Sequence, residues 1–264
     1  MPTSTKKFAP GHYFTLVGDR NTVFNEIAGE PRIRGGMERI NWKTLEPTKG
    51  NYNWSAVESL ASTYHSKGLT FSPFIQIKAF QGSVVPAYLK TAAYDGGVIP
   101  LDAPTNDPDG ADGENLKCWN PAVRAAWKAF MQAMAAEFDT DPRIYCIHLN
   151  ENSFGKVKTP LTTAQKTAWL DGWREMVRDA QAAWPNTVIV AKINNHMDIE
   201  EWPAQAEASG HGIGSPDLYL DADNLETNGT YDTFRDNVDP TTGGNVLFSQ
   251  MECNPENYRN SNHY

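Results

Sequence analysis

The chain has 264 residues, a formal net charge of −9 and a hydrophobic fraction of 40%. This length allows one large α/β domain with a sizeable core, or two smaller domains. The acidic balance excludes a general nucleic-acid binder, which needs a basic surface for the phosphates, and no apolar run is long enough to span a membrane.

The first half of the chain carries three predicted strands and one predicted helix. Short apolar runs predict the strands at 12–18, 33–42 and 69–77. Apolar side chains at helical spacing predict the helix at 53–68, which ends at Gly68 because glycine accommodates the backbone conformation that closes a helix. The segment 78–118 is long, polar and rich in Gly, Asp and Pro, and we interpret it as a loop.

The second half continues the alternation. Helices are predicted at 120–138, where Asn120 provides the N-cap, and at 162–184, where a threonine does. Strands are predicted at 143–149, 187–193, 212–220 and 245–251, and a further short helix is predicted near 199–209. Strands separated by helices of this length are typical of βα units and a parallel sheet.

The fold class follows from this alternation. The candidates are a (β/α)8 TIM barrel and an open doubly wound sheet. No glycine-rich phosphate loop follows a strand, so nucleotide-binding versions of the open sheet lose support. We therefore expect a single α/β domain over 1–264, folded as a (β/α)8 barrel. Because the predicted strands fall short of eight, we expect the barrel in this chain to be incomplete at its C-terminus unless a strand has been miscounted.

Residues at the carboxyl ends of barrel strands form the active site of this fold. Here those positions are polar and aromatic, as in a sugar-binding cleft. The candidate substrate contacts at or near them are Arg39, Trp42, Gln76, Lys78, Trp119, Asn150, Asn195, His196 and Tyr219. Several have a plain alternative: Trp42 and Trp119 fit the core equally well, and Arg39 fits a buried ion pair as well as a partner for a catalytic carboxylate.

Two carboxylates follow predicted strands in the same way. Glu151 comes after the strand at 143–149, and Glu252 after the strand at 245–251. Strands on opposite sides of a barrel can hold two carboxylates about 5 Å apart, the separation found in retaining glycosidases. Like charges at that distance keep one group protonated while the other is ionised, which suits an acid and a nucleophile. Glu256 competes with Glu252 but lies in a turn-like sequence.

Three segments of the chain resemble a known family. The sequence RGGMERINWKTLEPTKGNYNWSAVESLASTYHSKGL (34–69) resembles the second βα unit of the clan A glycoside hydrolases, especially the β-galactosidase-like branch. VPAYL (85–89) resembles the Pro-aromatic turn of that branch, and WNPAVRAAWKAFMQAMAAEFDTDPRIYCIHLNENSFG (119–155) resembles the segment that leads into its Asn-Glu motif. The region 210–245 matches poorly.

The resemblance implies a (β/α)8 barrel, a retaining mechanism and a carbohydrate substrate with a β-linkage. Carried onto this chain, Asn150 hydrogen-bonds the sugar 2-hydroxyl, Glu151 is the acid/base and Glu252 the nucleophile. No cofactor and no metal are expected. Two other functions stay open: a non-catalytic carbohydrate-binding barrel, and a domain of a larger surface or viral assembly.

Further sequence features are less informative. The acidic patch at 106–115 fits a solvated loop better than a calcium site, because its spacing does not match a calcium-binding loop. Residues 1–14 contain no apolar stretch, so no signal peptide is expected in this chain. The expected location is therefore extracellular if a signal was removed and cytoplasmic otherwise. Sequence patterns indicate no oligomeric state.

Overall fold

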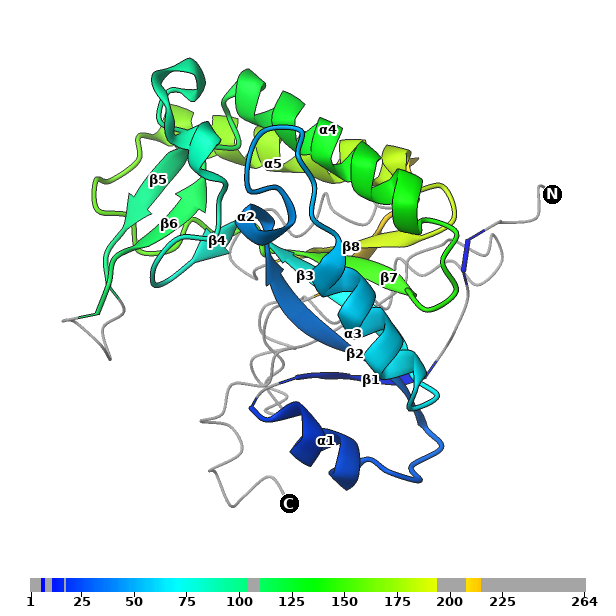
Figure 1. The fold of residues 1–264 in the computed structure, drawn as a ribbon. Helices are drawn as coiled ribbons and strands as arrows, with labels where there is room; N and C mark the ends of the chain where they lie inside the picture. Colours follow the sequence, from blue (N-terminus) through cyan, green and yellow to red (C-terminus); the bar gives the residue numbers. More distant parts are fainter. Residues whose placement is uncertain (1–5, 8–10, 17, 104–109, 194–207, 215–264) are drawn as a thin grey trace, which may run out of the picture.

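The computed structural model describes residues 6–7, 11–16, 18–103, 110–193 and 208–214 (Figure 1). Its centre is a six-stranded parallel sheet with the strand order β1-β2-β3-β7-β8-β9. The strands are β1 (His12–Thr15), β2 (Ile33–Asn41), β3 (Thr70–Gln76), β7 (Cys146–Leu149), β8 (Val188–Lys192) and β9 (Gly212–Gly214). Six of the seven predicted strands thus correspond to observed ones, and the seventh, at 245–251, lies outside the described residues.

The strand order decides between the two candidate folds. Each strand pairs with the strand that precedes it in this sheet and with the one that follows, without a reversal of direction. An open doubly wound sheet has a switch point where the order reverses, and this sheet has none among its described strands. The curved sheet therefore forms a half-barrel. Closure into a complete (β/α)8 barrel stays a prediction.

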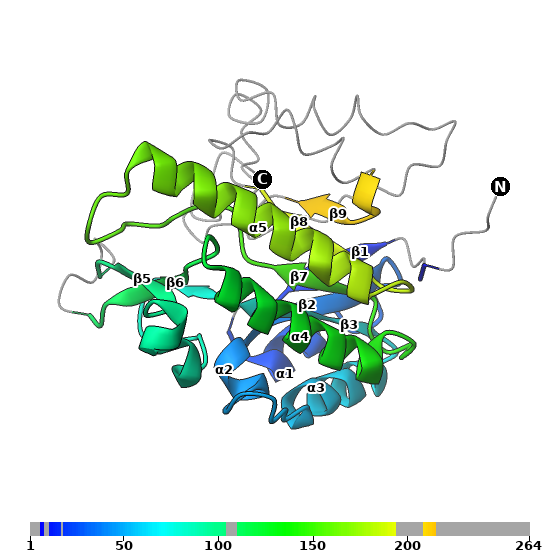
Figure 2. The same ribbon diagram turned by 90° about the horizontal axis from the view of Figure 1, so that it is seen from above.

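The long helices pack on one face of the sheet (Figure 2). They are α3 (Ser55–His65), α4 (Pro121–Phe138) and α5 (Thr163–Ala183), with the shorter α1 (Arg20–Glu26) and α2 (Trp42–Leu45) nearer β1 and β2. The main core fills the space between helices and sheet, and its largest members include Trp127, Trp169 and Trp173, each at most 1% exposed. No described helix is both long enough and apolar enough to cross a membrane.

The helix ends confirm the caps predicted from the sequence. The Asn120 side chain accepts a hydrogen bond from the Ala122 amide at 2.8 Å, so α4 begins where expected. Thr162 and Gln165 cap α5 reciprocally, an arrangement that satisfies two amides of the first turn. At the end of α3, Gly68 has φ +72°, the left-handed conformation that glycine adopts without strain.

The sequence did not predict α1, which has only seven residues and no periodic apolar pattern. Asp19 caps it by accepting from the Thr22 amide at 2.9 Å. Arg20 then reaches β2 with a two-pronged ion pair to Glu38, with both nitrogen–oxygen distances at 2.7 Å. The helix is therefore fixed by a cap and one ion pair more than by burial, because Phe24 is its one buried residue.

A second sheet occupies the segment that the sequence analysis interpreted as a loop. Three short antiparallel strands pair in the order β4-β6-β5. They are β4 (Lys78–Ala79), β5 (Val98–Leu101) and β6 (Gly113–Leu116), and the 3₁₀ helices η1 (Ala87–Lys90) and η2 (Ala92–Tyr94) lie between β4 and β5. The interpretation of 78–118 as a loop is therefore wrong. Strands of two to four residues are too short to show an alternating pattern.

Candidate active site

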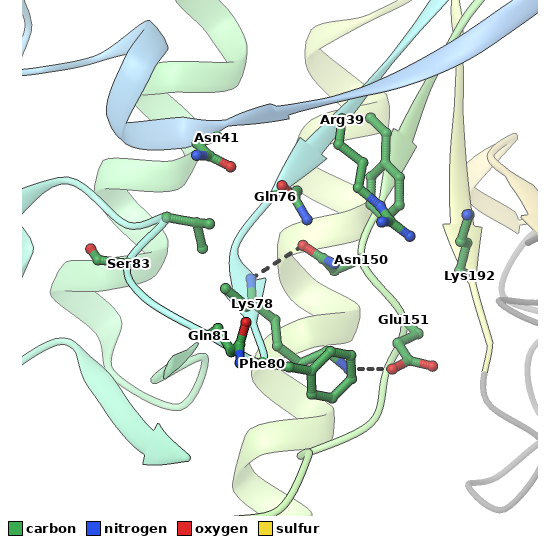
Figure 3. Close-up of a pocket in the computed structure, with 13 residues that line it drawn as sticks. Arg39, Asn41, Gln76, Lys78, Phe80, Gln81, Ser83, Asn150, Glu151 and Lys192 are labelled. Carbon is green, nitrogen blue, oxygen red and sulfur yellow. Dashed lines mark hydrogen bonds and ion pairs between the residues drawn. The ribbon is translucent and has the colours of Figure 1, made fainter. Parts of the chain in front are cut away.

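A pocket of about 470 Å³ opens at the carboxyl ends of the parallel strands (Figure 3). This volume lies within the range of small-molecule sites. The lining residues come from β2, β3, β7 and β8 and from β4 with the loop after it: Arg39, Asn41, Phe74, Gln76, Lys78, Ala79, Phe80, Gln81, Ser83, Val84, Asn150, Glu151 and Lys192. This is the end of a barrel at which active sites form.

Asn150 joins the ends of β7 and β3. Its side-chain oxygen accepts hydrogen bonds from the Ile77 amide at 2.6 Å and the Lys78 amide at 3.2 Å. Because both bonds fix the oxygen on the backbone of the neighbouring strand, the amide NH₂ is the end of the side chain that can donate to a ligand. The side chain is 6% exposed, so its orientation is set by packing as well as by hydrogen bonds.

Glu151 is held by two donors on the same carboxylate oxygen. The Lys78 ammonium forms an ion pair with Oε1, and the Ser153 hydroxyl donates to Oε1 at 2.7 Å. Lys78 also contacts the Ser153 hydroxyl at 2.7 Å, which closes a triangle of three side chains. Lys78 is 3% exposed. A buried ammonium in contact with a carboxylate favours the ionised form of that carboxylate.

Two further cationic side chains, Arg39 and Lys192, line the same pocket as Glu151. The Arg39 guanidinium stands 5.7 Å from the centroid of the Phe74 ring, and the Lys192 ammonium stands 4.3 Å from the same centroid. Burial lowers the pKa of Arg39 from its ordinary value, while the negative charge of Glu151 raises it. The described lining of the pocket thus carries three cationic side chains and one carboxylate. The described lining therefore has a net positive charge. It can accommodate a further negative group, either a second carboxylate of the protein or a group of the substrate.

Two ionisable side chains below the pocket, His148 and Cys146, are buried and uncharged. His148 lies on the same face of β7 as Asn150, and its Nε2 is 3.4 Å from the Cys146 sulfur. Burial, with Lys192 nearby, lowers the pKa of His148 well below its ordinary value, so the imidazole is neutral. Burial raises the pKa of the Cys146 thiol to about 12, so the thiol is not a nucleophile at neutral pH.

The small antiparallel sheet builds one wall of the pocket. Glu114 on β6 accepts hydrogen bonds from the Val84 and Val85 amides, both at 2.9 Å, and forms an ion pair with Lys90. These bonds fix the loop that contributes Ser83 and Val84 to the pocket. The expectation of a solvated acidic loop is therefore wrong for Glu114, which is 6% exposed. Its carboxylate is committed to the backbone instead.

The same sheet also supports the segment that follows Glu151. The Asn115 side chain donates to the carbonyl oxygens of Ser153 and Phe154, both at 3.1 Å. The Asp102 amide donates to the Lys156 carbonyl at 2.8 Å. Consequently one short sheet connects the end of β3 with the loop after β7.

The structure brings together five of the predicted site residues. Arg39, Gln76, Lys78, Asn150 and Glu151 all line the pocket.

Trp42 does not line the pocket. It is fully buried in the core, and its indole NH donates to Glu46 at 2.9 Å, so the prediction of a sugar contact is wrong and its alternative, a core position, holds. Trp119 is half-buried, packs against the core and is not among the lining residues, so it too is not placed at the pocket. The remaining predicted residues, Asn195, His196, Tyr219 and Glu252, lie outside the described residues.

Sequence analysis missed several contributors, and Lys192, Phe80 and Ser153 are the ones that bear on Glu151 and Lys78. Lys192 alternates with Val188 and Val190 on one face of β8, and this two-residue period after a buried strand was the signal for it. Ser153 and Phe80 follow strand ends by two or more residues, where strand periodicity no longer predicts a direction. Within the described part of the chain, no group of three or more His, Cys, Asp or Glu side chains is arranged to hold a metal ion.

Comparisons with known proteins identify the fold. No family model and no curated protein sequence matches the chain. The endo-glycoceramidase II of Rhodococcus sp., in complex with a cellobiose-like imidazole, superposes with a TM-score of 0.55 at 17% identity, over 87% of this chain and 60% of that one. The same enzyme as a lactosyl-enzyme intermediate gives a TM-score of 0.52 at 14% identity, over 90% and 69%. The beta-galactosidase of Rahnella sp. R3 gives 0.57 at 14% identity, over 96% and 46%.

These similar structures are glycosidases. The resemblance to the clan A glycoside hydrolases is therefore confirmed at the level of the fold. This chain spans 60% of the endo-glycoceramidase in its imidazole complex and less than half of the beta-galactosidase.

Proposed function

We propose that the protein is a retaining glycoside hydrolase that cleaves β-glycosidic bonds in an oligosaccharide or polysaccharide. One observation carries the proposal: Glu151 follows the fourth strand of the parallel sheet and faces a pocket in which Asn150 has its amide oxygen fixed and its NH₂ group available. The fold shared with glycosidases supports it, and so does the lactosyl-enzyme intermediate solved for one of them.

The proposed mechanism assigns one role to each carboxylate. Glu151 protonates the glycosidic oxygen, Glu252 attacks the anomeric carbon, and Glu151 then takes a proton from the water that releases the sugar. Asn150 donates to the 2-hydroxyl, a bond that strengthens as positive charge develops on the sugar. Arg39 and Lys192 offset the negative charge that a second carboxylate brings to the pocket.

Lys78 constrains the first step. The ammonium favours ionised Glu151, yet a general acid needs its proton. In the proposed cycle the negative charge of Glu252 opposes this effect and shifts Glu151 toward the protonated form, after which Lys78 is released to Ser153, which it already contacts at 2.7 Å. Once Glu252 is bonded to the sugar, its charge is lost and Glu151 ionises again, as the second step requires.

The Lys78–Glu151 pair also favours a second candidate. A carboxylate that stays ionised in an ion pair with a buried lysine can accept a hydrogen bond from a sugar hydroxyl without transferring a proton. This second candidate is a carbohydrate-binding barrel without catalytic activity.

Hydrolysis of a panel of β-linked oligosaccharides and polysaccharides separates the two candidates. We expect the wild type to release reducing sugar and Glu151→Gln to be about 10²- to 10⁴-fold slower, the usual contribution of a general acid/base. Glu252→Gln should be at least as impaired, and exposed Glu137→Gln serves as the control. Proton NMR of the first-formed anomer tests retention. Sugar binding by a folded wild type without turnover would establish the binding barrel, and unimpaired Glu151→Gln would refute the mechanism.

A further inference from the structure

Phe80 is unusual for its exposure. Among the residues that the structure describes, it is the one large hydrophobic side chain on the surface, with 54% of its area exposed. It also lines the pocket, where its ring stands beside the Lys78 side chain and close to Glu151 (Figure 3). A single exposed apolar side chain is ordinary on a protein surface, but this one belongs to the lining of a pocket, where a bound ligand can cover it.

The backbone around Phe80 is held on both sides. Ala79 pairs with Glu114 on β6 before it, and the Gly82 amide donates to the Asp112 carbonyl at 2.8 Å after it. Gly113 lies directly behind: a Cβ atom there would meet the Ala79 carbonyl oxygen at 2.2 Å and the Phe80 carbonyl carbon at 2.6 Å. Glycine at 113 therefore lets β6 approach closely, and the approach fixes the position from which the ring projects.

The position of the ring relative to Glu151 defines its role. The Lys78 ammonium lies 5.2 Å from the ring centroid and is bound to Glu151, so the ring and the carboxylate flank the same ammonium. If Glu151 is the general acid, the oxygen it protonates belongs to the leaving group, and a surface next to Glu151 at the mouth of the pocket touches that group. Resting on the proposed function, we propose that Phe80 is the binding surface for the leaving-group sugar ring.

The surroundings of Phe80 fit a sugar ring. A pyranose has an apolar face of C–H groups and a rim of hydroxyls, so it needs one flat aromatic surface with polar neighbours. Gln81 follows Phe80 and lies next to it, and Gln76 lines the same pocket, so polar neighbours are present (Figure 3). A lipid chain would instead need a continuous apolar surface, and no second large hydrophobic side chain is exposed among the described residues.

The test compares two substrates of the sugar that the panel identifies: its β-linked disaccharide and its β-glycosyl fluoride. The fluoride has no sugar in the leaving group and needs little acid assistance. For Phe80→Ala, the ratio of kcat/KM for the disaccharide to kcat/KM for the fluoride should fall by about tenfold, the order expected when an aromatic face loses its partner. Phe80→Tyr should keep the wild-type ratio. The ratio for Phe80→Leu, whose side chain is apolar but not flat, should lie between those of the wild type and Phe80→Ala.

Each outcome has a definite meaning. An unchanged ratio in Phe80→Ala overturns the proposal, because the ring then makes no distinction between the two leaving groups. An equal fall on both substrates also overturns it, because the effect is then independent of the leaving group. A lower ratio accompanied by a shifted basic limb of kcat/KM for the disaccharide overturns it too, because Phe80 then acts through Lys78 and Glu151. An alkyl β-glycoside of the same sugar serves as a third substrate: if Phe80→Ala lowers kcat/KM for it and not for the disaccharide, the surface binds an alkyl chain and the proposal is overturned. Failure of the wild type on both substrates refutes the proposed function itself.

Discussion

The two sheets of the molecule meet at one pocket but are held together differently. The parallel sheet owes its order to burial: alternate residues of β7 and β8 enter the main core, and helices cover that face. The antiparallel sheet has short strands and, besides the burial of Ile99 and Leu116, depends on two buried polar side chains: Glu114 accepts hydrogen bonds from backbone amides, and Asn115 donates to backbone carbonyls. The first sheet carries the groups proposed for the chemistry, and the second holds the wall and the proposed leaving-group surface. This difference predicts that different changes destabilise the two sheets.

Removing the Glu114 carboxylate should affect the antiparallel sheet most. Glu114→Ala leaves the Val84 and Val85 amides and Lys90 without their acceptor, and we expect the free energy of unfolding to fall by about 2 to 3 kcal/mol. Denaturant unfolding measures this change. The control is Glu30→Ala, which removes an ion pair with an arginine whose side chain is 75% exposed. Equal effects of the two substitutions would show that Glu114 does not organise the wall.

Acid should instead weaken the parallel sheet. Burial, with Lys6 and Arg178 nearby, lowers the pKa of His211, just before β9, from its ordinary value of 6.5 to about 4. Between those values the unfolded chain binds a proton that the folded chain does not. The free energy of unfolding therefore falls by up to about 3 kcal/mol from pH 6.5 to pH 4 and is unaffected by this group above pH 6.5.

Urea unfolding at pH 7 and pH 5 tests this prediction. His211→Gln should lose less stability between the two values than the wild type does, whereas exposed His65→Gln should behave like the wild type. The buried and neutral His148 contributes in the same direction, so His211→Gln should reduce the pH dependence without abolishing it. A wild type equally stable at both values would contradict the prediction.

The smallest expected effect concerns Lys78, at the junction of the two sheets. Lys78→Gln keeps a polar group of similar length but removes the positive charge that favours ionised Glu151. We expect the basic limb of kcat/KM to move to higher pH, because Glu151 then keeps its proton longer. We expect kcat to fall by up to about tenfold near pH 7, because the release step needs ionised Glu151. Lys78→Arg should restore the position of the limb. A merely structural role would lower activity without moving the limb.

The parallel sheet was predictable because burial leaves a periodic trace in the sequence. Apolar runs marked all six of its strands, and the caps at Asn120 and Thr162 fixed where α4 and α5 begin. The error at Trp42 arose at the end of a strand: β2 ends at Asn41, which lines the pocket, and Trp42 begins α2, whose buried residues pack into the core. Lys192 was missed although the period of two already placed it beside Val190 on the pocket face.

The antiparallel sheet leaves no such trace. Its hydrogen bonds join side chains to distant backbone: the Val84 amide donates to Glu114, and the Asn115 side chain donates to the Ser153 carbonyl. A polar, glycine-containing sequence of this kind is compatible with many loops, and its pairing depends on contacts with segments far away in the sequence. The ion pair of Lys78 with Glu151 was unpredictable for the same reason, although both residues were assigned to the site.

The pairing of Lys78 with Asn115 means that the excursion begins and ends at neighbouring points. Chain segments whose two ends lie side by side are tolerated as insertions and can be exchanged without rebuilding the domain that carries them. The exposed part of the stretch, from Phe80 to Gly82, can therefore vary, whereas Val84, Val85 and Leu89 belong to the main core and hold the stretch to the domain. Changing that exposed part would alter the proposed leaving-group surface, while Asn150 and Glu151 stay at the end of β7. The features proposed to select a substrate and those proposed to react with it are thus carried by separate parts of the chain.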